Sequence, residues 1–157
     1  TNTFHLYNGK ISYIMCVLKN GHMGQLYFGK RIHDKVNFSY LVEECQRPMT
    51  SYIYEGDRNF SLEHIRQEYP VYGTTDYRHP AIEILQKNGS RISEFVYEGY
   101  EITAGKVKLQ GLPATYAESD EEAMTLRVYL KDALTGVMLE LLYTVFLSIM
   151  QLHGAFV

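Results

Sequence analysis

The sequence predicts an all-β fold, an antiparallel β-sandwich with a long irregular loop and at most one short helix. Two Asn-Gly pairs, at 20–21 and 88–89, separate runs of apolar and aromatic residues, which is the pattern of β-hairpins. The 14 tyrosines add to this preference, because aromatic side chains fit the surface of a sheet better than a helix interior. No helix-like run is long enough to connect two parallel strands, so we expect the strands to pair antiparallel.

The first predicted hairpin begins with a strand over residues 10–19 and returns over 23–28. Successive side chains of a strand point to opposite faces, and the apolar residues of 10–19 fall into two alternating sets. These sets are Ile11, Tyr13, Met15 and Val17, and Ile14, Cys16 and Leu18. Both faces of this strand are therefore expected to be buried.

Two further hairpins are predicted downstream. One joins a strand at 81–86 to a strand at 90–102 through the second Asn-Gly pair. The other joins 126–131 to 137–146 through a turn at 132–136. Together with the first hairpin, they supply the strands of a two-layered sandwich.

A long structured loop is predicted between the first two hairpins. Residues 29–80 contain repeated Gly and Pro among many aromatics, and a loop of this length in a compact domain is usually functional. One short helix is predicted within it at 61–68, with Ser61 as its N-cap.

Charge and composition exclude several classes of partner. The net charge is −3 with Lys and Arg dispersed among Asp and Glu, so we expect no binding to nucleic acid or to an anionic membrane. The longest apolar run, 137–150, is interrupted by Glu140 and is too short to cross a bilayer as a helix. The six histidines are scattered and no Gly-rich loop opens a helix, so we expect neither a metal nor another cofactor.

The cysteines and the first residues favour a cytoplasmic protein. Cys16 and Cys45 show no paired spacing and are interpreted as reduced thiols. Residues 1–5 lack the charged and then apolar pattern of a signal peptide.

The stretch from 52 to 81 interleaves aromatic residues with charged ones. Aromatic faces hold the C–H surfaces of sugars, and charged groups hydrogen-bond their hydroxyls, so Asp57, Arg58, Asp76 and Arg78 are candidate sugar contacts. The alternative is structural, because pairs such as Asp76 and Arg78 more often bridge each other or cap backbone groups.

Six ordered segments carry a family resemblance. Three lie close together, at 57–62 (Asp-Arg-Asn-Phe-Ser-Leu), 67–70 (Gln-Glu-Tyr-Pro) and 73–81 (Gly-Thr-Thr-Asp-Tyr-Arg-His-Pro-Ala). Three more follow at 111–116, 121–126 and 143–146. In this order they resemble the N-terminal domain of the α-galactosidases of glycoside hydrolase family 36, and the resemblance covers residues 4–146.

The resemblance implies one part of a larger bacterial enzyme. Such an enzyme has a β-supersandwich, a (β/α)₈ barrel and a small β domain, is often a tetramer, and cleaves terminal α-linked galactose from sugars such as melibiose and raffinose. Both catalytic aspartates of this retaining glycosidase lie in the barrel, so no residue here is expected to be catalytic. The family's pocket-wall arginine corresponds to Arg58, and an acidic residue of the same loop to Glu43.

Residues 147–157 depart from the family pattern. The family continues with acidic residues and an Ile-x-Arg-Ser segment, which is absent here. One set of codons for 146–156, with a single T added at its start, encodes Phe-Ser-Glu-His-Tyr-Ala-Ile-Ala-Arg-Ser-Phe. We therefore expect residues 1–146 to be an incomplete N-terminal domain and 147–157 to be a frameshifted tail, which sequencing of the encoding DNA tests.

Other functions remain open from the sequence. Unpaired strand edges invite pairing between chains, so a homo-oligomer is expected. The main alternative to part of an α-galactosidase is a non-catalytic carbohydrate-binding or oligomerisation module, motivated by the aromatics of 52–81. A third hypothesis is a hydrolase built on Cys45 with His64 or His79.

Overall fold

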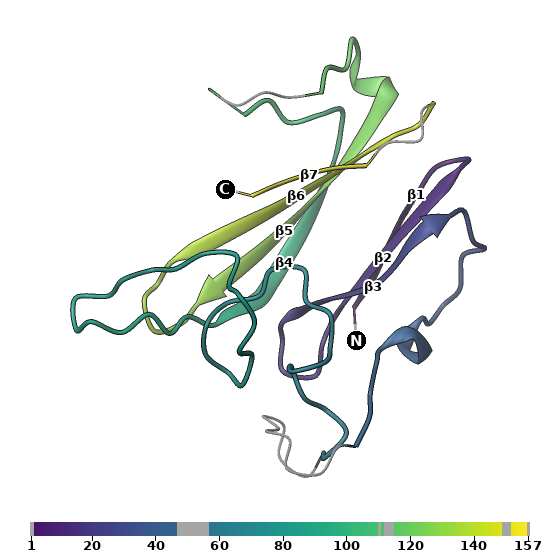
Figure 1. Cartoon of the computed structure of the whole chain (residues 1–157). Coiled ribbons are helices and arrows are strands. Elements are labelled where there is room, and N and C mark those ends of the chain that lie inside the picture. Colours follow the sequence, from purple (N-terminus) through teal and green to yellow (C-terminus); the bar gives the residue numbers. More distant parts are fainter. Residues whose placement is uncertain (1, 47–56, 110, 112–114, 149–151, 157) are drawn as a thin grey trace.

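The computed structural model describes residues 2–46, 57–109, 111, 115–148 and 152–156, and in these residues the fold is all-β. Figure 1 shows two antiparallel sheets side by side. The three-stranded sheet contains, in spatial order, β1 (Thr3–Tyr7), β2 (Ile11–Val17) and β3 (Met23–Lys30). The four-stranded sheet contains β4 (Phe95–Ala104), β5 (Ala123–Asp132), β6 (Met138–Phe146) and β7 (Leu152–Phe156). The described helical elements are two 3₁₀ turns, η1 (Ser39–Leu41) and η2 (Asp120–Glu122).

The main core lies between the two sheets, as expected for a sandwich. The first sheet contributes buried residues such as Phe4, Met15 and Met23, and the second contributes Val128 and Leu141. Because both sheets bury apolar side chains on their facing surfaces, the hydrophobic effect holds the two layers together.

The prediction that β2 is buried on both faces is confirmed. Tyr13, Met15 and Val17 belong to the core between the sheets. The alternate set forms a second core with residues from the long loop. This second core contains Ile14, Cys16, Leu18, Leu26, Phe38, Phe60, Leu62 and Ile65. The first sheet is therefore covered by the second sheet on one face and by the loop on the other.

The turn between β2 and β3 is fixed to the second sheet. Gly21 has a φ of 86°, and its carbonyl accepts a 2.9 Å hydrogen bond from the backbone N–H of Tyr97. A Cβ at Gly21 would lie 2.7 Å from a methyl carbon of Val96, so a larger residue does not fit without a shift. The predicted Asn-Gly turn is thus also a contact between the two sheets.

The third predicted hairpin is confirmed and the second is wrong. Strands β5 and β6 pair from Ala123↔Phe146 to Lys131↔Met138. In contrast, 81–94 forms no extended strand, and β4 begins at Phe95 and pairs with β5. A tight turn remains at 86–90, where the N–H of Gln86 donates to the Ser90 carbonyl over 2.9 Å. Ile84 packs against the main core, but Leu85 beside this turn is 67% exposed and has no second layer to bury it.

The predicted helix at 61–68 is also wrong. Only one turn forms, in which the N–H of Ile65 donates to the Ser61 carbonyl over 3.4 Å. The following backbone pairs with β3 instead, because the Arg66 carbonyl accepts from the Gln25 N–H and the Glu68 N–H donates to the Met23 carbonyl. Pairing with a strand edge therefore uses the groups that a second helical turn would need.

Strands β1 and β7 lie outside the three predicted hairpins. β1 pairs with β2 from Thr3↔Cys16 to Tyr7↔Ser12. β7 lies within the segment interpreted as a frameshifted tail and pairs antiparallel with β6. No helix among the described residues is both long and apolar enough to span a bilayer.

Candidate functional site

The two residues assigned to a pocket wall, Arg58 and Glu43, are both exposed. Within the part of the chain that the structure describes, neither side chain makes a hydrogen bond or ion pair. Other members of the candidate set are already engaged, because Asp57 binds Lys19 and Asp76 binds Arg78. Among the four sugar-contact candidates, Arg58 is therefore the one whose side chain has no partner within the described residues.

A lysine connects the neighbours of the two candidates. Lys19 Nζ lies 2.6 Å from Asp57 Oδ2 and 3.0 Å from Glu44 Oε1. Asp57 precedes Arg58, and Glu44 follows Glu43. The hydrogen bond from Lys19 lowers the pKa of the Asp57 carboxyl, and the hydrogen bonds to Asp57 and Glu44 raise the pKa of Lys19. The structure thus brings the two predicted wall positions to one side of the first sheet.

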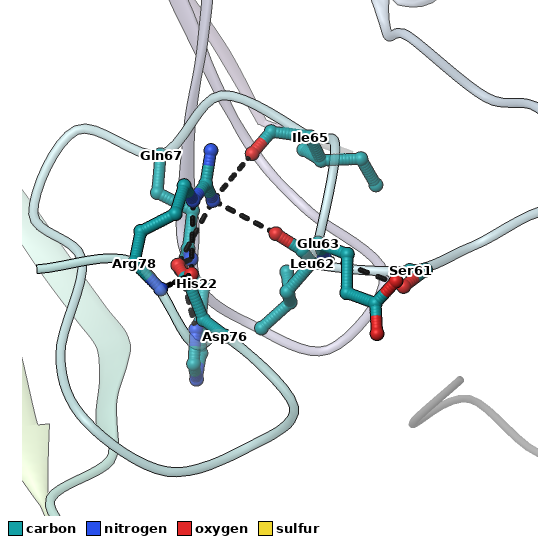
Figure 2. Close-up of polar contacts among 8 residues, drawn as sticks. All are labelled: His22, Ser61, Leu62, Glu63, Ile65, Gln67, Asp76 and Arg78. Atoms are coloured by element: carbon teal, nitrogen blue, oxygen red, sulfur yellow. Dashed lines mark hydrogen bonds and ion pairs between the residues drawn. The ribbon is translucent and has the colours of Figure 1, made fainter. Parts of the chain in front are cut away.

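The segment that follows Arg58 is held by a buried carboxylate and a guanidinium, shown in Figure 2. Arg78 donates to Asp76 through Nε (2.9 Å to Oδ1) and through Nη2 (2.9 Å to Oδ2). The same Nη2 donates to the carbonyls of Leu62 (2.8 Å) and Ile65 (2.9 Å). Asp76 and Arg78 therefore bridge each other, and Arg78 also caps backbone carbonyls, as the structural alternative predicted.

A second chain of hydrogen bonds supports this pair from the turn before β3. Gln67 Nε2 donates to Asp76 Oδ2 over 2.6 Å, so its Oε1 accepts from His22 Nδ1 at 3.0 Å. Figure 2 shows His22, Gln67, Asp76 and Arg78 together. Burial acts to raise the pKa of Asp76, but the hydrogen bonds from Arg78 and Gln67 outweigh it and hold this pKa below its ordinary value.

The backbone before Asp76 is strained. Thr74 and Thr75 have φ values of 47° and 67°, a region that β-branched residues rarely adopt. Their hydroxyl oxygens are buried and have no partner among the described residues. The hydrogen bonds of Asp76 therefore hold a conformation that the two threonines disfavour.

A different carboxylate anchors the end of the segment inside the sandwich. The Tyr13 hydroxyl lies 2.7 Å from both oxygens of Glu68, and the Tyr143 hydroxyl donates to Oε2 over 2.6 Å. Tyr13 belongs to β2 and Tyr143 to β6, so the carboxylate joins the two sheets. Burial raises the pKa of Glu68, and the two tyrosine hydrogen bonds oppose that rise.

A Ser-His-Asp arrangement also occurs, on the loop side of the first sheet. His5 Nδ1 lies 2.8 Å from Asp34 Oδ1, and His5 Nε2 lies 2.9 Å from Ser12 Oγ. Ser12 is fully buried, and its Oγ accepts a hydrogen bond from the Ile32 N–H at 3.0 Å. A nucleophile needs access to its substrate, so this arrangement fixes the loop at 31–34 and does not form a catalytic triad.

The thiols and cavities add little to the site. Cys16 and Cys45 are free, and burial raises the pKa of Cys16 to about 11, which disfavours its reactive thiolate. No group of three or more potential metal ligands occurs among the described side chains. A cavity of about 520 Å³ lies between β1 and the second sheet, but neither Arg58 nor Glu43 lines it.

Comparison with known proteins resolves the family. Residues 21–149 match the model of the glycosyl hydrolase family 36 N-terminal domain. The chain belongs to this family.

The relatives of this family 36 domain are α-galactosidases. It is 40% identical over 146 residues to α-galactosidase AgaA of Geobacillus stearothermophilus, covering 93% of this chain and 20% of the relative. It is 36% identical over 149 residues to α-galactosidase 1 of Pediococcus pentosaceus, covering 91% and 20%. The chain therefore spans about a fifth of the length of the relatives that it matches.

Solved structures of the family share the fold. The α-galactosidase of Lactobacillus brevis superposes with a TM-score of 0.92 at 38% identity, covering 98% of this chain and 21% of that chain. A variant of AgaA in complex with raffinose superposes with a TM-score of 0.91 at 37% identity, covering 99% and 21%. These matches confirm both the predicted family and the predicted all-β class.

Proposed function

We propose that this chain is the N-terminal domain of an α-galactosidase that removes terminal α-linked galactose from oligosaccharides such as melibiose and raffinose. The observation that carries the proposal is the family match across residues 21–149. Relatives of known structure include AgaA variants in complex with raffinose and with stachyose. In this proposal the catalytic carboxylates belong to another part of the enzyme, and this domain supplies Arg58 and Glu43 to the wall of the substrate pocket.

The position of Arg58 suits this role. Its side chain is exposed, while the residues around it are fixed by Lys19 at one end and by Arg78 across the following turn. A guanidinium presents several N–H donors in a planar fork, which matches the hydroxyl oxygens of a sugar. Placed at a pocket wall, such a group orients the substrate without taking part in bond cleavage.

A chimeric enzyme tests the proposal. Residues 1–146 would replace the corresponding segment of AgaA, and hydrolysis of raffinose and of a chromogenic α-galactoside would be measured. We expect an active chimera, in which Arg58→Ala raises KM about tenfold, or ~1.4 kcal/mol, with kcat changed less than about twofold. Arg91→Ala is the matched control, because Arg91 is also exposed and pairs with Glu83, away from Arg58 in the sequence.

The isolated chain is expected to be inactive on the same substrates. Hydrolysis by the pure 157-residue chain would contradict the proposal. So would a folded chimera without activity, or one in which Arg58→Ala leaves KM at the control value.

A carbohydrate-binding module is the second candidate. The observation that favours it is the exposure of Tyr72 (49%) and Tyr77 (72%) beside the Asp76 network, because exposed aromatic rings can stack on sugars. Calorimetric titration of the isolated chain with galactose and melibiose distinguishes the two functions, since only this module predicts binding without the rest of an enzyme.

Assembly and location are further parts of the proposal. Among the described strands, β4 pairs only with β5, so its other edge offers backbone groups to another chain. We expect a homo-oligomer in light scattering, and a monomer at high concentration would contradict this. Fractionation of the producing bacterium tests the expected cytoplasmic location.

A further inference from the structure

Lys19 touches both flanks of the candidate site, although it belongs to neither. It follows β2, and its ammonium reaches Glu44 and Asp57, the sequence neighbours of Glu43 and Arg58. The ammonium also lies 5.8 Å from the centre of the buried Phe60 ring, two residues after Arg58. One cation therefore sets the separation of the two chain segments that carry the proposed wall residues.

The backbone that carries Lys19 is held by hydrogen bonds on both sides of the residue. The Leu18 N–H donates to the His22 carbonyl over 2.8 Å, and the Gly21 N–H donates to the Leu18 carbonyl over 2.9 Å. The close contact of Gly21 with Val96 then fixes this turn to the second sheet. The contacts with the sandwich thus fix the position of Lys19, and its ion pairs fix the segments that carry Arg58 and Glu43.

The charges around Lys19 are expected to affect the position of the two wall residues more than the stability of the domain. Lys19, Glu44 and Asp57 are all partly exposed, and ion pairs of this kind contribute little to folding. Loss of the cation nevertheless leaves two carboxylates facing the same space, where they repel each other. The expected consequence is a displaced site in a domain that still folds.

We propose that Lys19 is a positioning residue that holds Arg58 and Glu43 at the spacing needed to bind the galactoside. This inference rests on the proposed function, since it concerns the same pocket wall. It predicts that Lys19 affects substrate binding and leaves the bond-breaking step unchanged, because Lys19 itself does not touch the substrate.

The first test uses the 157-residue chain. Backbone ¹⁵N relaxation would be measured for Arg58 and Glu43 in Lys19→Met, in Lys19→Arg and in the control Lys131→Met. Lys131 is a good control because it also makes an exposed ion pair, with Glu98 on the second sheet. We expect lower order parameters only in Lys19→Met, and unchanged values there would overturn the inference.

The second test uses the chimera with AgaA. Lys19→Met is expected to raise KM about fivefold with unchanged kcat, and Lys19→Arg is expected to restore it. Between about 0.05 and 0.5 M salt, KM should rise with Lys19 present, because salt weakens its ion pairs, and should fall in Lys19→Met, because salt screens the repulsion between Glu44 and Asp57. If Arg58→Ala raises KM and Lys19→Met does not, only this inference fails. If Arg58→Ala has no effect, the proposed pocket wall fails.

Discussion

Two carboxylates anchor the loop that carries Arg58, and they are stabilised in opposite ways. Asp76, in the long loop, is paired with the guanidinium of Arg78, which lowers its pKa. Glu68, between the sheets, accepts hydrogen bonds from Tyr13 and Tyr143, and its pKa is raised because burial outweighs them. A buried carboxylate is thus held even without a cation, but the pH dependence of its contribution to stability then has the opposite sign.

Removal of the Arg78 guanidinium should have the largest effect on stability. Arg78→Met leaves Asp76, at 1% exposure, without its counter-charge and frees the carbonyls of Leu62 and Ile65. We expect a loss of about 2–3 kcal/mol, less than for a fully buried pair because Arg78 is partly exposed. Urea unfolding of the chain measures this loss, and Arg78→Lys should lose less. A loss below that of an exposed pair such as Arg91–Glu83 would show that the guanidinium is dispensable.

Removal of one phenol hydroxyl tests the other anchor. Tyr143→Phe removes a 2.6 Å hydrogen bond to Glu68 without creating a large cavity. Hydrogen bonds to charged groups contribute about 1.5–3 kcal/mol, so we expect a loss of about 2 kcal/mol in urea unfolding. Tyr129→Phe is the matched control, because its hydroxyl meets Glu101 at the exposed surface. Equal losses for the two variants would contradict a special role of the interior carboxylate.

The two anchors should respond to pH with opposite signs. The raised pKa of Glu68 means that the folded state binds this proton more tightly, so its contribution is fully present below the ordinary value of 4.5 and is lost as pH rises through the folded pKa. The lowered pKa of Asp76 gives a contribution that is present above 3.8 and is lost as pH falls through the folded pKa. Unfolding of Glu68→Gln and Asp76→Asn from pH 3 to pH 8 checks both signs, and parallel curves would refute the contrast.

The smallest expected effect concerns the strained backbone beside Asp76. Thr75→Gly removes a β-branched residue with a φ of 67° and a buried hydroxyl that lacks a partner. We expect a gain of about 0.5–1 kcal/mol in thermal or urea unfolding. Thr135→Gly, in the turn after β5, is the control and should not stabilise, because Thr135 has no positive φ and its hydroxyl accepts a hydrogen bond from the Val137 N–H.

The sequence predicts those features that repeat along the chain or follow a local turn signal. The two buried faces of β2 and the hairpin of β5 and β6 belong to this class. The hairpin expected at 81–102 failed because alternation alone does not show whether a second layer covers the strand.

The anchors could not be located from the sequence for a different reason. Glu68 meets Tyr143 across 75 residues, and Lys19 meets Asp57 across 38, so neither pair has a local period or spacing. The segment 67–70 resembles a family motif, but the partner of its glutamate is set by the packing of the two sheets. A single surface lysine such as Lys19 carries no signature at all.

The double burial of β2 also has a consequence for how the chain finds its native pairing. Where one face of a strand is polar, a slip by one residue is penalised because it buries polar groups, but both faces of β2 are apolar. The preference for the native register over a slipped one therefore depends on two hydroxyls of β2. Ser12 contacts His5, and Tyr13 contacts Glu68. A strand that slipped by one residue would direct each hydroxyl to the wrong layer, so these two side chains specify the pairing register of the first sheet.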